Sequence, residues 1–415
     1  MRRRIVRHMR NALLLLLLML GCNLHGADRE PALARDMAED AILRNDVQGM
    51  DLARGRLLRL AAESADRTVQ RDAYYLAALT SMFDSYSGEH DAAANARIVA
   101  SGSRYAARVL ELDPQFADGW LVAGLLGGRT PESRARIAKA VELDPKSPAV
   151  AFFSALFRSM NPLGGAPPEG VKMFDDLAAR LDADRAATGR RFGLWDAQAH
   201  AWSIYTRIAQ DEPNAPPMRA MAAKLVAERP DFDLGQQLAG FVAERRFVAA
   251  PAVTWQPFLT DAANDGKSPQ HPDVLSVDRA ENGDRLWYRV TFREPLPRSF
   301  GVNLVVNRSG DPATGMKWWG NGSNFHFDRL VTAYITRDGD RYFGRVGLTD
   351  DDGARGAKII KFPIDIQLAM SDDQRSVMLG VPKTALELTD SSTMIVAGGT
   401  HLVWNDDATS APNSR

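Results

Sequence analysis

The chain has 415 residues, of which 45% are hydrophobic and 25% are charged, which are ordinary values for globular domains. Its 51 basic and 52 acidic residues leave a net charge of −1. This argues against a general nucleic-acid binder, because such proteins carry a basic excess. The single cysteine excludes an intramolecular disulfide framework and a cysteine-rich zinc site.

The first 21 residues have the pattern of a secretory signal peptide. Five arginines and no acidic residue stand in residues 1–10, and an apolar run follows at residues 12–20. This run is shorter than the roughly 20 residues that span a bilayer as a helix. Leu20 and Gly21 then precede Cys22, which resembles the lipobox of bacterial lipoproteins, although Met19 stands where leucine is usual.

The lipobox resemblance implies that residues 1–21 are removed and that Cys22 becomes the acylated first residue, with residues 22–30 as a tether. Acyl chains stabilise an anchor by roughly 0.8 kcal/mol per buried methylene. Asn23 replaces the aspartate that retains enterobacterial lipoproteins in the inner membrane, which implies an outer-membrane location. Removing five arginines changes the net charge from −1 to −6. The alternative is an ordinary cleaved signal peptide with an incidental cysteine.

Residues 31–248 are predicted to be helical, because apolar residues recur there at spacings of three and four. The sequence RVLELDP at residues 108–114 recurs as KAVELDP at residues 139–145. A weaker copy, KLVAERP, occupies residues 224–230. Proline cannot continue a helix, so each copy is predicted to end one.

These segments resemble the tetratricopeptide repeat, in which a Trp-x-x-Leu-Gly pattern opens the helix after such a turn. Trp120 and Gly124 stand at those places, although Pro114 and Pro145 are 31 residues apart rather than about 34. The resemblance implies an α-solenoid whose stacked helix pairs offer a concave surface to a partner protein. The alternative is a compact helical scaffold without a ligand.

The composition changes after the helical region. Residues 249–272 are rich in Pro, Asp, Gly and Asn and are predicted to form a linker. Residues 273–407 alternate short β-rich runs with turns, which predicts a two-sheet antiparallel β-sandwich, and residues 408–415 form a tail. The fold class expected is therefore α+β and multidomain. The expected strands are 286–292, 302–306, 325–336, 342–348, 359–366, 377–381, 394–397 and 402–404.

The order of motifs in this last third resembles the DOMON-like and family 9 carbohydrate-binding domains. A strand at residues 302–307 leads to the sequence DPATG at residues 311–315, and a later strand ends in Pro-Lys at residues 382–383. The resemblance implies a sandwich that binds a carbohydrate, through aromatic faces and orienting polar groups. Core packing is the alternative for the two tryptophans. The candidate residues are Trp318, Trp319, Asn321, Asn324, His326 and Asp328.

Two cofactor interpretations concern the same domain. Hard cations bind clustered oxygen ligands, so Asp311, Asp350 and Asp352 are candidates for a structural calcium ion. Asn307 and Arg308 stand where the related domains often carry an acid. Some DOMON-like domains bind haem, for which axial ligands are needed. The residues that could supply them are Met316, His326 and His401.

Motifs for catalysis are absent from the sequence, including Gly-x-Ser-x-Gly, His-Glu-x-x-His and the full phosphate-binding loop. We therefore expect a non-enzymatic, lipid-anchored binding or scaffold protein of a bacterial envelope, with no nucleic-acid partner. It would dock a partner protein on its repeats, bind a carbohydrate or second partner on its sandwich, and contact the membrane only through its lipid. The alternatives are an envelope hydrolase with a carboxylate site between the domains, and a purely structural assembly scaffold.

Overall fold

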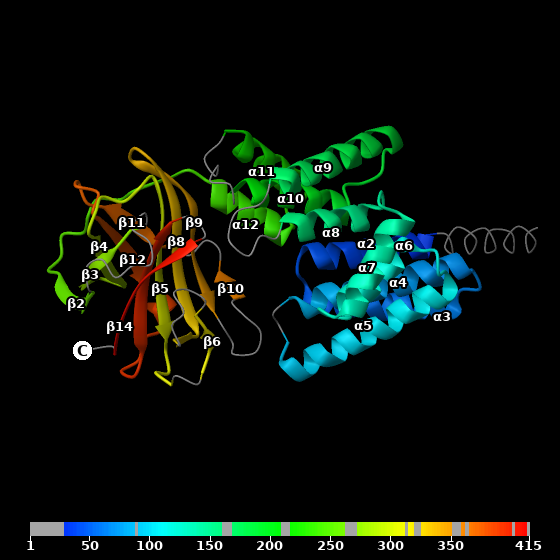
Figure 1. The fold of residues 1–415 in the computed structure, drawn as a ribbon, viewed down its shortest axis with the longest axis horizontal. Coiled ribbons are helices and arrows are strands. Elements are labelled where there is room, and N and C mark those ends of the chain that lie inside the picture. The colour runs from blue at the N-terminus through cyan, green and yellow to red at the C-terminus, as the bar shows by residue number, and fades with distance from the viewer. Residues whose placement is uncertain are drawn as a thin grey trace, which may run out of the picture. The chain divides into compact units, whose positions relative to one another are not determined.

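The structure is a computed structural model that describes residues 29–87, 90–159, 168–208, 216–261, 272–311, 314–318, 325–350, 358–361, 365–400 and 403–412. Helices α2–α12 come first and two antiparallel sheets follow, so the α+β prediction is confirmed (Figure 1). The chain divides into two compact units. They are Met1–Glu89 with Ala93–Ala151, and His90–Ala92 with Phe152–Arg415. No helix in the described ranges is long and apolar enough to cross a bilayer.

The first unit is helical, and three of its described helices begin at a side-chain cap. Asp46 accepts a hydrogen bond from the backbone N–H of Gly49 (2.9 Å), and Thr130 accepts one from that of Ser133 (3.1 Å). Helix α2 contacts both α3 and α4, and α4 contacts α6. The helices are α2 (Arg29–Leu43), α3 (Val47–Glu63), α4 (Arg67–Ser85), α5 (Ala92–Leu112), α6 (Ala117–Leu126), α7 (Pro131–Leu143) and α8 (Pro148–Ser159), which continues into the second unit.

The repeated segments end helices at the predicted places. Helix α5 ends at Leu112 and α7 at Leu143. In both copies the following aspartate, Asp113 or Asp144, accepts a hydrogen bond from the backbone N–H two residues further on, at 3.0 and 2.9 Å. The two turns therefore share one geometry as well as one sequence.

The weaker third copy, at residues 224–230, shares a contact with the first copy. Trp120 Nε1 donates to the carbonyl oxygen of Pro114 (2.9 Å), and Gln236 Nε2 donates to that of Pro230 (2.8 Å). Each donor stands six residues after its proline and lies in the helix that follows the turn. The first copy thus shares one turn contact with the second copy and another with the third.

The second unit carries the remaining helices and the sheets. Aromatic rings fill its helical part, where Phe174 stacks on Trp202 with ring centroids 5.8 Å apart. The helical region was expected to reach residue 248, but its last helix ends at Val242. Arg245 donates to the carbonyl oxygens of Gly240 (2.7 Å) and Gly344 (2.9 Å) and lies in the strand that follows. These helices are α9 (Pro168–Thr188), α10 (Leu194–Ile208), α11 (Pro216–Glu228) and α12 (Asp233–Val242).

In the described residues, one sheet has seven strands in the order β1-β9-β8-β5-β13-β14, with β10 also paired to β9, and the other has five in the order β11-β12-β4-β3-β2. The first contains β1 (Arg245–Arg246), β5 (Ser299–Asn307), β8 (Arg329–Asp338), β9 (Arg341–Asp350), β10 (Lys358–Lys361), β13 (Thr393–Thr400) and β14 (Val403–Pro412). The second contains β2 (Gln256–Thr260), β3 (Val274–Asn282), β4 (Arg285–Phe292), β11 (Gln367–Met370) and β12 (Ser376–Pro382).

The two sheets share a hydrophobic core. Alternate residues of each strand enter it, as a strand period of two requires. Leu304 and Val331 come from the seven-stranded sheet, and Tyr288, Val290 and Leu379 come from the other. A small pair of strands, β6 (Met316–Lys317) and β7 (His326–Phe327), and a short helix, α13 (Lys383–Leu386), complete the described elements.

Part of the expected linker is a strand. Residues 256–260 form β2, which pairs with β3 at one edge of the five-stranded sheet. Neither β2, β3 nor β11 is among the strands expected from the sequence. These additional strands matter for function, because two of them form the site described next.

Candidate functional site

The loop predicted to bind a carbohydrate contains a buried tryptophan. Trp318 is 1% exposed and packs with Val305, Leu330 and Phe327, whose ring centroid lies 6.1 Å from that of Trp318. A ring buried in this way offers no exposed face on which a sugar could stack. Trp319, Asn321 and Asn324 lie outside the described residues, so the role predicted for them stays a prediction.

Two predicted polar residues of this loop, His326 and Asp328, help to hold the chain in place. Asp328 Oδ1 accepts a hydrogen bond from the backbone N–H of Arg308 (3.0 Å) and pairs with its Nε (3.2 Å). Arg308 also pairs with Glu387 (2.6 Å). The carbonyl oxygen of His326 accepts a hydrogen bond from the side chain of Asn307 (3.1 Å). These contacts give the loop a structural framework.

Asn307 is the centre of that framework. Its side chain is buried, and its Nδ2 also donates to the carbonyl oxygen of Asp311 (2.9 Å). Its Oδ1 accepts from the backbone N–H of Gly310 (2.8 Å). A carboxylate could not donate these bonds, so the local structure requires an amide here.

Of the three predicted metal ligands, the structure describes the side chain of Asp311 alone. Asp311 is exposed, Asp350 ends β9, and Asp352 lies outside the described ranges. No group of three or more His, Cys, Asp or Glu side chains in the described ranges could hold a metal ion. Among the proposed axial haem ligands, Met316 and His326 lie in β6 and β7, and His401 is not described.

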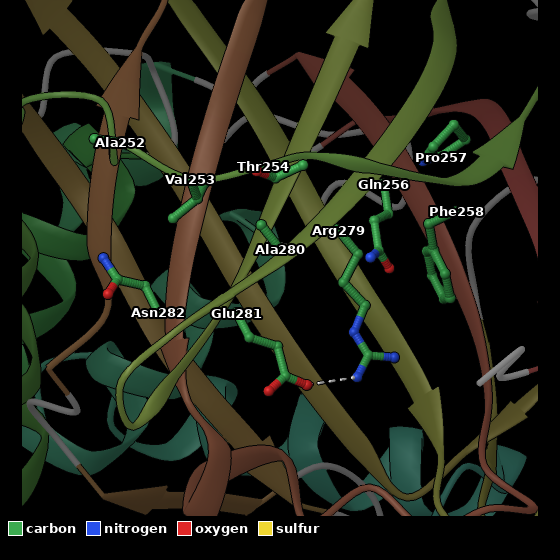
Figure 2. A pocket seen from close by; sticks show the side chains of 10 residues that line it. All are labelled: Ala252, Val253, Thr254, Gln256, Pro257, Phe258, Arg279, Ala280, Glu281 and Asn282. Atoms are coloured by element: carbon green, nitrogen blue, oxygen red, sulfur yellow. Dashed lines mark hydrogen bonds and ion pairs between the residues drawn. The ribbon is translucent and has the colours of Figure 1, made fainter.

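A pocket of about 740 Å³ lies at the edge of the five-stranded sheet (Figure 2). Two stretches line it, the chain leading into β2 and the end of β3. Its lining is mixed, with aliphatic and aromatic carbon beside amide, hydroxyl and charged groups. The lining residues are Ala252, Val253, Thr254, Gln256, Pro257, Phe258, Arg279, Ala280, Glu281 and Asn282.

Strand pairing aligns the polar side chains of the pocket. Gln256 lies opposite Arg279 in the antiparallel register of β2 and β3, so both side chains project from the same face. Glu281, two residues beyond Arg279, projects from that face as well. Figure 2 shows the three side chains pointing to the same side of the strand. Ala280 alternates to the opposite face and packs against Trp287.

The opposite face anchors the chain that crosses the pocket. Trp255 and Val253 pack against a cluster that includes Ala280 and Trp287. The guanidinium carbon of Arg289 lies 4.7 Å from the centre of the Trp255 ring, within the range of a cation–π interaction. Residues 252–258 are therefore held by Trp255 rather than left as a free linker.

Glu281 contacts two cationic side chains, those of Lys383 and Arg279. Lys383 Nζ contacts Glu281 Oε2 at 2.8 Å, and Arg279 Nη2 contacts Oε1 at 3.4 Å. The hydrogen bond and charge of Lys383, followed by the charge of Arg279, lower the pKa of Glu281. The carboxylate is consequently ionised at neutral pH and acts as a hydrogen-bond acceptor.

No protein-family model matches the sequence, and no curated protein is significantly similar to it. We therefore infer the ligand chemistry of the pocket from its lining residues. Thr254, Gln256 and Asn282 add hydroxyl and amide groups to a lining that also includes the Arg279–Glu281 pair and the Phe258 ring. This combination suits a ligand with many hydroxyl groups and apolar C–H faces.

The sequence predictions did not include these residues. Residues 252–258 were expected to belong to the linker, and residues 279–282 were expected to belong to the β-sandwich without a role in binding. One residue could have indicated an ordered segment here. Trp255 is a large aromatic residue inside a segment otherwise typical of a linker.

Proposed function

We propose that the protein is a lipid-anchored binding protein of a bacterial cell envelope. In this proposal the β-sandwich binds a carbohydrate and the helical repeats dock a partner protein. The observation that carries it is the mixed pocket formed by residues 252–258 and 279–282. The proposal keeps the ligand class expected from the sequence and moves its binding site away from Trp318.

The lining of the pocket supports a carbohydrate. Planar amides such as Gln256 and Asn282 can donate and accept at once, which matches neighbouring hydroxyl groups of a sugar. Phe258 and Pro257 supply apolar surface for the C–H face of the ring. A volume of about 740 Å³ lies in the usual range for small-molecule sites.

The carboxylate chemistry supports binding rather than hydrolysis. Hydrolysis of a glycoside typically uses two carboxyl groups, one of which is a general acid with a raised pKa. Glu281 is the one carboxylate among the described lining residues, and Lys383 lowers its pKa. An ionised Glu281 can orient a hydroxyl group but has no proton to give.

Anchoring and partner docking complete the proposal. Acylation of Cys22 would hold the chain at the membrane, and several acyl chains are enough for stable attachment. The helix–turn–helix junctions at Pro114, Pro145 and Pro230 support stacked helical repeats. Stacked repeats of this kind offer an extended surface to a protein partner.

A purely structural assembly scaffold is the second candidate. The burial of Trp318 favours it, because that interpretation expects both Trp318 and Trp319 to be buried. It predicts no glycan binding at any part of the chain.

A glycan array probed with the full-length protein in detergent distinguishes the carbohydrate-binding protein from the purely structural scaffold. We expect selective binding that is lost in the double variant Gln256→Ala/Asn282→Ala and kept in Gln115→Ala, which removes an exposed amide from the helical part. Absence of binding by the wild-type protein, or equal binding by the double variant, would contradict a carbohydrate site in this pocket.

A further inference from the structure

The helical part of the second unit presents a row of aromatic side chains on α8 and α10. Phe157 on α8 is 45% exposed, and Tyr205 on α10 is 44% exposed. Trp195 and Trp202 of α10 are half-buried. We call these four residues the aromatic row. Single exposed apolar residues are ordinary on a protein surface, whereas a contiguous apolar patch marks an interaction site, so the continuity of the row decides its meaning.

Ring contacts and helix spacing make the aromatic row continuous. The ring centroid of Phe153 lies 6.2 Å from that of Phe157 and 6.1 Å from that of Trp195. Trp202 follows Trp195 after seven residues, which is two helical turns, and therefore lies on the same face of α10. Its ring centroid is 5.0 Å from that of Tyr205. The four side chains thus belong to one patch.

Buried rings hold the inner side of the aromatic row. The centroid of Phe152, which is buried, lies 5.6 Å from that of Trp195 and 6.3 Å from that of Trp202. Phe174 of α9 is buried as well, and its ring stacks on that of Trp202. Side chains packed in this way lose little conformational entropy when a ligand covers their outer side.

The aromatic row also carries hydrogen-bond donors. An indole N–H can only donate, and a phenol O–H can donate as well as accept. The side-chain polar atoms of Trp195, Trp202 and Tyr205 form no hydrogen bond within the described part of the chain. Since these side chains are at least partly exposed, their donors are accessible to a ligand.

The acidic groups next to the row in the sequence are already paired. Asp175 binds Arg207 at 2.5 Å, and Asp196, which is buried, binds Arg190 at 2.6 Å. A ligand on the aromatic row therefore meets apolar rings and donors rather than free carboxylates. A sugar suits such a surface poorly, because each of its hydroxyl groups also needs an acceptor.

A proline-rich segment matches this chemistry. Each proline has a carbonyl acceptor and an apolar ring but no N–H. Consecutive prolines form a polyproline II helix whose carbonyl oxygens have no internal partners. Such a helix is extended before it binds, and aromatic-lined surfaces are the usual sites that recognise it.

We propose that the aromatic row binds a proline-rich, extended segment of the partner protein. This inference rests on the proposed docking of a partner by the helical repeats, and it names the chemistry of the segment that is recognised. It assigns Trp195, Trp202 and Tyr205 a role in recognition besides their packing.

Fluorescence anisotropy of a labelled decaproline peptide, titrated with the full-length protein in detergent, tests the inference. The control peptide is a decamer of alternating glycine and serine, which has no rings and is flexible. We expect wild-type protein to bind decaproline about tenfold more tightly than the control peptide. Tyr205→Ala should weaken binding of decaproline by about tenfold. Tyr86→Ala, which removes a 74% exposed tyrosine of the first unit, should leave it unchanged.

The conservative variant Tyr205→Phe keeps the test independent of folding. It retains the ring that packs on Trp202 and removes a hydroxyl group that has no partner within the described residues. Its melting temperature should therefore equal that of wild type. Binding of decaproline should still weaken by roughly threefold, because one hydrogen bond to a carbonyl oxygen of the peptide is lost.

The outcomes distinguish this inference from the function on which it rests. Equal affinities for the two peptides, or wild-type affinity for decaproline in both Tyr205 variants, would overturn the proline-rich assignment. A glycan whose binding is lost in Tyr205→Ala would overturn it as well. A protein captured equally from native membranes by wild type and by Tyr205→Ala would exclude the aromatic row and leave partner docking in place. Absence of both captured protein and decaproline binding would overturn both proposals.

Discussion

At the scale of single residues, Asp182 shows how this chain uses its many charges. Hydrogen bonds reach its carboxylate from Lys224 (3.1 Å), His200 (3.2 Å) and Arg185 (3.2 Å), joining α9, α10 and α11. Burial opposes ionisation of Asp182, but these three donors outweigh it and lower its pKa from 3.8 to about 2. The carboxylate thus ties three helices together in its ionised form.

This depressed pKa predicts how stability depends on pH. The contribution of Asp182 is fully present above pH 3.8 and is lost as the pH falls through about 2. Asp182→Asn should therefore melt at a lower temperature than wild type at pH 7, and the difference should shrink as the pH falls from 4 toward 2. Calorimetric scans at several pH values check this. A difference that is independent of pH would show that the ionised form is not what stabilises the helices.

Asn307 gives a second prediction at this scale. Asn307→Asp removes the donor to the carbonyl oxygens of Asp311 and His326 and should destabilise the protein by about 1–3 kcal/mol. Asp311→Asn, at an exposed position, is the matched control and should have little effect. Urea denaturation with and without calcium measures both. If calcium made Asn307→Asp more stable than wild type, the position would be a metal site that lacks its acid.

At the scale of elements, the five-stranded sheet depends on a close contact between β12 and β4. A Cβ atom at Gly380 would lie 2.6 Å from the ring of Trp287, which supports the segment carrying Trp255. Gly380→Ala should therefore destabilise the protein by about 1–3 kcal/mol.

The matched control for this variant is Gly55→Ala in α3, where a Cβ would meet no other atom within 4 Å. Alanine there should stabilise the helix by roughly 0.5–1 kcal/mol. Thermal unfolding of both variants is the measurement. An equal change of melting temperature in the two variants would show that the Trp287 ring moves away from the added methyl group without loss of stability.

The elements that the sequence predicted correctly are those with local signals. The helices end at Leu112 and Leu143 because the Asp-Pro that follows each one cannot continue a helix. The strand around Val290 shows the alternation of a half-buried strand. These signals depend only on neighbouring residues, so the sequence displays them.

The elements that were missed depend on partners distant in the chain. Strand β3 carries Asp278 and Glu281, which are neutralised by Arg289 (2.8 Å) and Lys383 (2.8 Å). Without those partners the stretch has the pattern of a surface turn. The pocket was missed for the same reason, since β2 and β3 build it together. The carbohydrate prediction selected Trp318 for its ring, and burial of that ring depends on Phe327 and Leu330, which only the fold brings together.

At the scale of the whole molecule, attachment to the membrane is proposed to depend on one atom, the Cys22 sulfur. Cys22→Ser should release the protein from the membrane fraction and abolish incorporation of labelled palmitate. With residues 1–21 removed the chain carries a net charge of −6, so electrostatic attachment to anionic lipid is not expected to replace the lipid.

Washing the membranes with concentrated salt is the control for this prediction. Salt screens charge interactions, so wild-type protein held by acyl chains should stay in the membrane fraction. Release of the wild type by salt, or retention of Cys22→Ser, would contradict a lipid anchor.

The most direct test of a carbohydrate site at the sheet edge is hydrogen–deuterium exchange on the full-length protein, with and without a saturating glycan selected on the array. The pocket predicts added protection in residues 252–260 and 276–282, where β2 and β3 meet, with little change elsewhere in the sheets. Protection confined to the loop at residues 315–328, or protection in neither region, would contradict the assignment of the site to this pocket.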